Sequence, residues 1–151
     1  MAARPAADWR ADAAPVFVDT NILFYAYDRD AGAKRERAIE VLEICFASRR
    51  GRLSIQVLQE FSVNLWKHLR TTPLARSINA ILAPYREWPV HRPKVEDVIE
   101  ANRLVTASRI SFWDAMIVVS ARASGAAWLL TENLQNGQRI EGVLVRNPLD
   151  R

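Results

Sequence analysis

Short apolar runs alternate with longer helical patterns along this chain, and this alternation limits the fold more than any other feature. Four runs have the length of buried strands: Val16-Phe17-Val18, Leu53-Ser54-Ile55, Ala127-Trp128-Leu129-Leu130 and Val143-Leu144-Val145. Apolar spacing predicts helices over residues 34–48, 57–69, 94–107 and 112–124, and Pro73 can open another towards Tyr85. We therefore expect an α/β fold with a mostly parallel sheet and helices on both faces.

The size and composition are those of one globular domain. The chain has 151 residues, half of them apolar, which suffices for a single core. We expect a domain over residues 15–151 after a loosely ordered leader over residues 1–14. No signal peptide and no apolar stretch of about 20 residues is present, so no membrane role is expected. Cys45 lies in an apolar run and is predicted to be buried, in keeping with a cytoplasmic protein.

The charge balance is basic, with a net charge of +4 and a pI near 9.7. Such a balance favours contact with a polyanion, because Lys and Arg neutralise phosphates. Arg supplies 18 of the 21 basic residues. A codon bias towards Arg would give the same count, so charge alone leaves the partner open.

Polar residues directly after the apolar runs are candidates for function, because ligands of α/β sheets bind outside the carboxyl ends of the strands. The first run is followed by Asp19-Thr20-Asn21 and a later one by Thr131-Glu132-Asn133. Asp19 has two interpretations. It either caps the helix that follows or contributes a carboxylate to a site.

Two further acids lie within helical patterns. Glu60 falls at the border of an apolar helix face, where it either reaches water or points into a cleft. Asp114 falls in the first turn of a very apolar helix, where an unpaired buried carboxylate would be costly. Ser111-x-x-Asp114 fits a capping box, and a carboxylate stabilised by the helix dipole is also well placed to hold a cation.

Together, Asp19, Glu60, Asp114 and Glu132 would gather negative charge at one end of the sheet. Like charges raise one another's pKa values, so such a cluster stays ionised only with a cation among its members. Oxygen ligands favour Mg²⁺ or Mn²⁺ over zinc. His68 and His91 show no metal-ligand spacing and are expected at the surface.

The sequence resembles the PIN domain family in four motifs that occur in the family's order over about residues 15–149. They are Val18-Asp19-Thr20-Asn21-Ile22-Leu23, Gln56-x-x-Gln59-Glu60-Phe61, Ser111-Phe112-Trp113-Asp114-Ala115 and Leu130-Thr131-Glu132-Asn133-Leu134-Gln135-Asn136-Gly137. The last motif is similar to that of VapC-like toxins of bacterial type II toxin-antitoxin systems. The resemblance implies a three-layer α/β/α sandwich with an acidic metal-binding pocket that cleaves single-stranded RNA.

Carried over residue by residue, the resemblance makes Asp19, Glu60 and Asp114 catalytic residues and metal ligands. The fourth acidic position departs from the family pattern: Asn133 stands where Asp is usual, with Glu132 just before it. We count both as candidate ligands. An Asn keeps a carbonyl oxygen but loses the charge, so one or two bound ions remain possible.

The implied reaction is Mg²⁺-assisted hydrolysis of an RNA phosphodiester, with Mn²⁺ as a possible substitute. Thr20, Asn21 and Ser111 are expected to position the attacking water or a phosphate oxygen. Arginines at the rim, with Arg109 and Arg122 as candidates, would neutralise the RNA backbone. The implied partners are RNA, a cognate antitoxin protein and a second copy of the chain.

Two other functions fit parts of the pattern. Asn133 suggests a noncatalytic RNA-binding or regulatory module on the same fold. A receiver-like or nucleotide-binding α/β domain also gathers acids at strand ends, but this chain lacks a Gly-rich phosphate loop, and none of Lys34, Lys67 and Lys94 follows a late strand.

Overall fold

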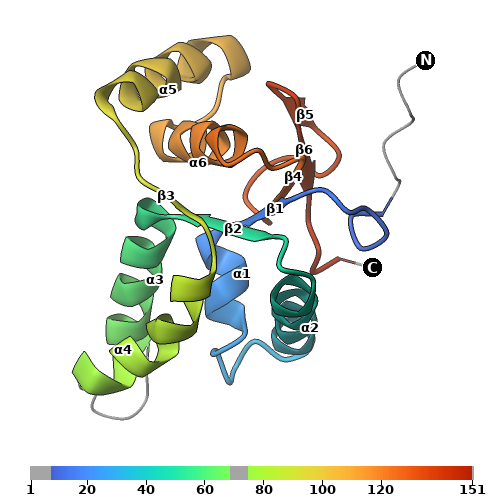
Figure 1. The fold of residues 1–151 in the computed structure, drawn as a ribbon, viewed down its shortest axis with the longest axis vertical. Helices are drawn as coiled ribbons and strands as arrows, with labels where there is room; N and C mark the ends of the chain where they lie inside the picture. Colours follow the sequence, from blue (N-terminus) through green and yellow to red (C-terminus); the bar gives the residue numbers. More distant parts are fainter. Residues whose placement is uncertain (1–7, 69–74, 151) are drawn as a thin grey trace.

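The computed structural model describes residues 8–68 and 75–150, which form one sheet between two layers of helices (Figure 1). Along the chain the elements are β1 (Val16–Val18), α1 (Thr20–Tyr25), α2 (Ala33–Ser48), β2 (Gly51–Ser54), α3 (Ile55–His68), α4 (Ala75–Leu82), the 3₁₀-helix η1 (Ala83–Glu87), β3 (Val90–His91), α5 (Val95–Ser108), α6 (Phe112–Ala123), β4 (Trp128–Leu130), β5 (Arg139–Ile140) and β6 (Val143–Arg146).

The sheet order is β3-β2-β1-β4-β6-β5, and every neighbouring pair is parallel except β5 with β6. In Figure 1, α5 and α6 lie on one side of the sheet and α1 to α4 on the other. This confirms the predicted α/β class with a mostly parallel central sheet. β1 and β4, at the centre, are fully buried, as continuous apolar strands of a covered sheet should be.

The course of the chain creates a switch point beside β1. From β1 the chain adds β2 and then β3 on one side, and it later returns to place β4 on the other side. The backbone N–H of Asp19 donates to the carbonyl of Leu130 at 3.0 Å, which joins the ends of these two strands. Open α/β sheets bind ligands at the carboxyl ends of strands at such a point.

Local features explain where the structure differs from the sequence prediction. Ile55, predicted as strand, begins α3, because the Ser54 hydroxyl accepts from the Val57 N–H at 3.3 Å and starts the helix there. The prediction omitted β3 and β5, which have only two residues each and show no pattern. Pro73 lies outside the described residues.

Residues 8–14, the described part of the predicted leader, contact the core. Trp9 is buried, its carbonyl accepts from Arg50 Nη1 at 3.1 Å, and Asp12 accepts from Trp128 Nε1 at 2.8 Å. Cys45 is buried as predicted. Among the described residues no single helix is long and apolar enough to cross a membrane, and only α5 and α6 taken together, bent by 115°, meet that test.

Candidate active site

Asp19 lies at the end of β1, where its predicted capping role is confirmed and its role as a site carboxylate stays a prediction. As the N-cap of α1 its Oδ1 accepts from the Thr20 N–H at 2.7 Å, and its Oδ2 accepts from the Thr131 hydroxyl at 2.8 Å. Burial raises the pKa of Asp19 to about 6, although both hydrogen bonds oppose this, and the negative charges of Glu60 and Asp114 raise it further. The carboxyl group is therefore buried next to two other acids.

Glu60 points from α3 towards α1 rather than to water. Its Oε2 accepts from the Thr20 hydroxyl at 2.8 Å, and its Oε1 accepts from Gln56 Nε2 at 2.9 Å. Because Thr20 also donates its N–H to Asp19, one residue connects the two carboxylates. Gln56 Nε2 donates in addition to the carbonyl of Trp113 at 3.3 Å and so ties α3 to the start of α6.

Asp114 lies in the first turn of α6, where the helix dipole favours a carboxylate. Ser111 is the N-cap, and its hydroxyl accepts from the Asp114 N–H at 3.1 Å. The Asp114 carboxylate is half-buried and has no hydrogen bond or ion pair with the described residues. Its charge acts on Asp19, so α6 brings the third acid to the same end of the sheet.

Asn21 completes this group from α1. Its Nδ2 donates to Thr131 Oγ1 at 3.3 Å and to Asp19 Oδ2 at 3.5 Å. Its Oδ1 is buried and has no partner among the described residues, and the same holds for Gln56 Oε1. A buried amide oxygen without a donor is unusual and available to a ligand.

Glu132 and Asn133 occupy different surroundings. The Glu132 carboxylate accepts from Lys34 Nζ at 3.0 Å and from the Tyr25 hydroxyl, so both of its oxygens have partners other than the Asp19 group. Asn133 is exposed, and only its backbone N–H contacts the group, through Thr131 Oγ1 at 3.1 Å. Thr20 thus links Asp19 and Glu60, Asp114 lies near enough for its charge to act on Asp19, and Glu132 is paired with a lysine.

Sequence reasoning assigned no role to Gln56 and Thr131, two residues that hold this site together. Thr131 follows β4 directly, a position that could have indicated its role. Gln56 stands in one of the four motifs, but its contact with Trp113 joins residues 57 positions apart and has no local signal. The contact of Lys34 with Glu132, 98 positions away, has none either.

The donor set fits a hard divalent cation by its chemistry. Among the residues that the structure describes, no three Asp, Glu, His or Cys side chains are arranged to hold one metal ion. Mg²⁺, however, commonly binds through one or two carboxylates and keeps several waters. Asp19, Glu60 and Asp114 make no contact with a described Lys or Arg, and the Asn21 amide oxygen adds a neutral ligand.

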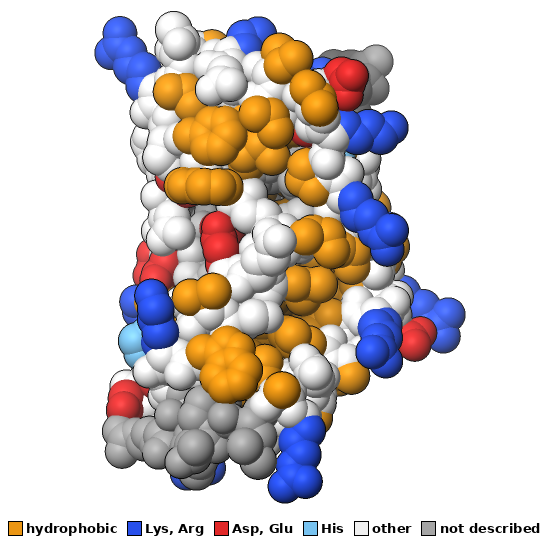
Figure 2. Space-filling model, turned by 90° about the vertical axis from the view of Figure 1, so that its left-hand side faces the viewer, with side chains coloured by type: hydrophobic (Ala, Val, Ile, Leu, Met, Phe, Trp, Pro, Cys, Tyr) orange, Lys and Arg blue, Asp and Glu red, His pale blue; other side chains and the backbone are white. Residues whose placement is uncertain are grey.

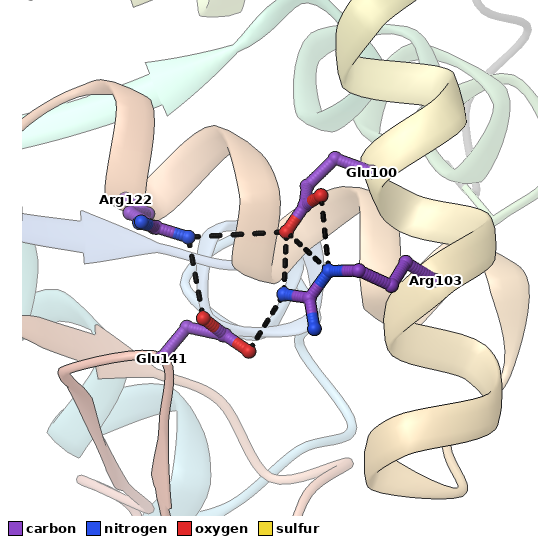
Figure 3. A network of polar contacts seen from close by, with 4 residues as sticks. All are labelled: Glu100, Arg103, Arg122 and Glu141. Atoms are coloured by element: carbon purple, nitrogen blue, oxygen red, sulfur yellow. Dashed lines mark hydrogen bonds and ion pairs between the residues drawn. The ribbon is translucent and has the colours of Figure 1, made fainter.

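Of the two arginines predicted at the rim, Arg122 lies far from the acids and Arg109 is exposed without a polar partner among the described residues. Arg122 lies at the far end of α6 from Asp114, where it binds Glu141 at 3.3 Å and Glu100 at 3.9 Å in a network with Arg103 (Figure 3). Eight residues of helix separate it from Asp114, or about 12 Å, so Arg122 is not a rim residue. Arg109 is exposed, ends α5 in a left-handed conformation, and has no polar partner among the described residues.

The prediction that His91 lies at the surface was wrong. The ring is half-buried, with Nδ1 3.0 Å from Ser120 Oγ and Nε2 3.4 Å from Asp97 Oδ2. A serine, a histidine and an aspartate in contact resemble a hydrolase triad, but Ser120 is fully buried and no substrate can reach it. The contact instead joins β3 to α5 and α6.

Comparison with known proteins identifies the family. The sequence profile of the PIN domain matches residues 16–135, which include every predicted site residue. This chain belongs to the PIN domain family. No curated protein matches the sequence.

Solved structures share this PIN fold at low sequence identity. A toxin-antitoxin complex from Klebsiella pneumoniae superposes with a TM-score of 0.64 at 19% identity, covering 88% of this chain and 97% of that one. VapBC2 from Rickettsia felis, bound to a DNA fragment from its promoter, superposes with a TM-score of 0.60 at 19% identity, covering 87% of this chain and 96% of that one. VapC20 from Mycobacterium tuberculosis, a toxin that cleaves the sarcin-ricin loop, superposes with a TM-score of 0.57 at 20% identity, covering 76% of this chain and 86% of that one.

Proposed function

We propose that this PIN domain is a Mg²⁺-dependent endoribonuclease and the toxin of a toxin-antitoxin pair. One observation carries the proposal. At the switch point of the sheet, Thr20 joins the Asp19 and Glu60 carboxylates, Asp114 acts on Asp19 electrostatically, and no described basic side chain neutralises them. An acidic group of this kind suits a divalent ion that handles a phosphodiester.

Asp19, Glu60 and Asp114 would hold the ion, directly or through its bound waters, and Asn21 Oδ1 is a candidate for a further ligand. When bound, Mg²⁺ supplies charge to the scissile phosphate and activates water for hydrolysis. Ser111 can position a phosphate oxygen, because its hydroxyl accepts from Asp114 and keeps its own proton to donate. Thr20 donates its hydroxyl proton to Glu60, so it orients that carboxylate.

The proposed partners are single-stranded RNA, an antitoxin and a second copy of the chain. The antitoxin is suggested by two fold neighbours, the toxin-antitoxin complex from Klebsiella pneumoniae and VapBC2 from Rickettsia felis. RNA is supported by the neighbour whose stated target is the sarcin-ricin loop and by the basic balance of the chain. Exposed apolar side chains on α5, among them Val95 and Ile99, are candidates for the contact between copies.

An RNA cleavage assay tests the activity. We expect the purified protein to cleave RNA with Mg²⁺ or Mn²⁺ and to stop when EDTA is added. Glu60→Gln and Asp114→Asn should each lower the rate by about 100-fold or more, because both remove charge from the ion site. Glu40→Gln, on the exposed face of α2, is the matched control and should leave the rate unchanged. Cleavage that survives both substitutions and chelation would contradict the proposal.

A noncatalytic RNA-binding module is the second candidate. Two observations favour it. Asn133 stands at the fourth acidic position of the family and carries no charge. Among the described residues, no three Asp, Glu, His or Cys side chains are arranged to hold one metal ion. For such a module we expect RNA binding that does not depend on Mg²⁺ and no cleavage under any metal.

A further inference from the structure

The indole of Trp113 is the most exposed of the five tryptophans in this chain. Trp9, Trp88 and Trp128 are buried, Trp66 is 48% exposed and Trp113 is 63% exposed. Trp113 directly precedes Asp114 at the start of α6. The least buried large aromatic side chain of the described residues therefore belongs to the residue next to Asp114, at the start of α6.

Trp113 has two contacts with its neighbours. Its backbone carbonyl accepts from Gln56 Nε2, the same atom that donates to Glu60. The ring of Phe112 packs against it edge to face, with the centroids 5.2 Å apart. A rigid aromatic surface loses little conformational entropy when a ligand stacks on it.

The surroundings of Trp113 match a single-stranded nucleic acid. A pocket of about 380 Å³ on α3 is lined by Gln59, Glu60, Val63 and Asn64 and so shares Glu60 with the candidate site. Arg109, which has no polar partner among the described residues, lies four residues before Trp113 in the chain. The side of the molecule where α3, α4 and α5 lie shows acidic side chains between hydrophobic areas, with Lys and Arg towards the edges (Figure 2).

We propose that Trp113 is a stacking platform for an unpaired base next to the phosphate that the acidic group holds. This inference rests on the proposed ribonuclease function and adds to it a requirement for an unstacked base. Every base offers a face to an indole, so Trp113 selects single strands rather than a sequence. A protein chain that covered Trp113 would have to supply a cation for the Asp114 carboxylate, which has no polar partner among the described residues.

The test measures RNA binding in the Glu60→Gln background, where cleavage does not interfere. A labelled single-stranded RNA is titrated and its fluorescence anisotropy followed. We expect Trp113→Ala to raise Kd by about 5- to 150-fold, which is the range for loss of one stacked base. Trp113→Phe should recover most of this affinity. Trp66→Ala, which removes the other exposed indole, should not change Kd.

Two further substrates separate stacking from other contacts. For the same sequence with abasic sites, and for a blunt RNA duplex, Trp113→Ala and the parent should bind alike. In the cleaving protein, Trp113→Ala should raise KM with little change in kcat. Unchanged Kd for single strands, or equal losses for the Trp66 and Trp113 variants, would overturn the stacking role.

Sedimentation of the same variants distinguishes the remaining cases. If Trp113→Ala dissociates an oligomer while the RNA affinity stays constant, Trp113 belongs to a contact between copies and the inference is wrong. RNA binding that depends on Trp113 without any cleavage by the wild type would retain the stacking role and refute the nuclease. RNA cleavage that does not depend on Trp113 would retain the nuclease function and refute the stacking role.

Discussion

Asp19 illustrates how one side chain serves both the fold and the site. As the N-cap of α1 and the acceptor of the Thr131 hydroxyl, it connects the ends of β1 and β4. The same burial that permits these contacts raises its pKa to about 6, with Glu60 and Asp114 adding to the effect. Folding thus moves the pKa of this acid towards neutral pH.

Asp19→Asn should stabilise the metal-free protein at neutral pH. The folded pKa of Asp19 lies above its ordinary value of 3.8, so its favourable contribution is complete below about pH 4 and is lost as the pH rises through about 6. A difference of about two pKa units corresponds to about 3 kcal/mol, from which the weakened hydrogen bonds subtract about 1 kcal/mol. Urea unfolding in EDTA at pH 4 and pH 7.5 measures the difference.

The free energy of unfolding of Asp19→Asn should exceed that of the wild type by about 1–3 kcal/mol at pH 7.5 and should equal it at pH 4. Glu40→Gln, which changes an exposed charge, should show no such pH dependence. A gain of equal size at both pH values would show that the ionisation of Asp19 does not limit stability.

Three helix starts meet at the site, and a side chain caps each of them. Asp19 caps α1, Ser54 accepts from an N–H at the start of α3, and Ser111 caps α6. These caps define the point at which each helix begins and hence where Glu60 and Asp114 lie. Helix N-termini also favour negative charge, which offsets part of the repulsion among the acids.

Ser111→Ala should destabilise the protein by about 1 kcal/mol, because the Asp114 N–H loses its acceptor. Ser111→Asp keeps an acceptor at the cap, so its free energy of unfolding should stay within a few tenths of a kcal/mol of the wild-type value. Urea unfolding at pH 7.5 gives both values. If the two variants are equally destabilised, the cap does not account for the role of Ser111 in the fold.

At the scale of the whole molecule, the position of β4 beside β1 decides the geometry of the candidate site. The long return from β3 through α5 and α6 places Thr131 next to Asp19 and brings Asp114 to the same edge. The surface network of Glu100, Arg103, Arg122 and Glu141 joins α5, α6 and the turn between β5 and β6. Exposed pairs of this kind contribute little individually, so the packed core holds the arrangement.

Mg²⁺ should stabilise the whole protein by binding the folded state only. At 100 times its Kd the ion contributes about 2.7 kcal/mol, which for a chain of this size raises Tm by about 5–10 °C. Thermal unfolding with Mg²⁺ and with EDTA checks this. Glu60→Gln and Asp114→Asn should reduce the shift, whereas an identical shift in all variants would place the ion elsewhere.

Trp9→Ala should destabilise the protein by about 3–5 kcal/mol, although Trp9 precedes β1, because its indole is buried in the core. Arg10→Ala, at an exposed neighbour, is the control and should cost well under 1 kcal/mol. Urea unfolding of both variants decides the matter. A small effect of Trp9→Ala would assign residues 8–14 to a dispensable leader.

The acids and the fold class were predictable from the sequence because both depend on local patterns. Apolar runs of strand length have to be buried, and alternation with helices leaves few topologies other than a parallel sheet. Asp19 and Asp114 follow from capping rules that operate within one helical turn. Four motifs in order also predicted the family to which the chain belongs.

Contacts between residues distant in the chain were decided only by the tertiary structure. Nothing local pairs Glu132 with Lys34, directs Glu60 to Thr20 or buries Trp9, because each depends on which elements pack together. The same holds for Arg122, whose charge the sequence shows but whose partner Glu141 lies on the turn between β5 and β6. Side-chain chemistry is encoded locally, but its partners are set by the order of the strands in the sheet.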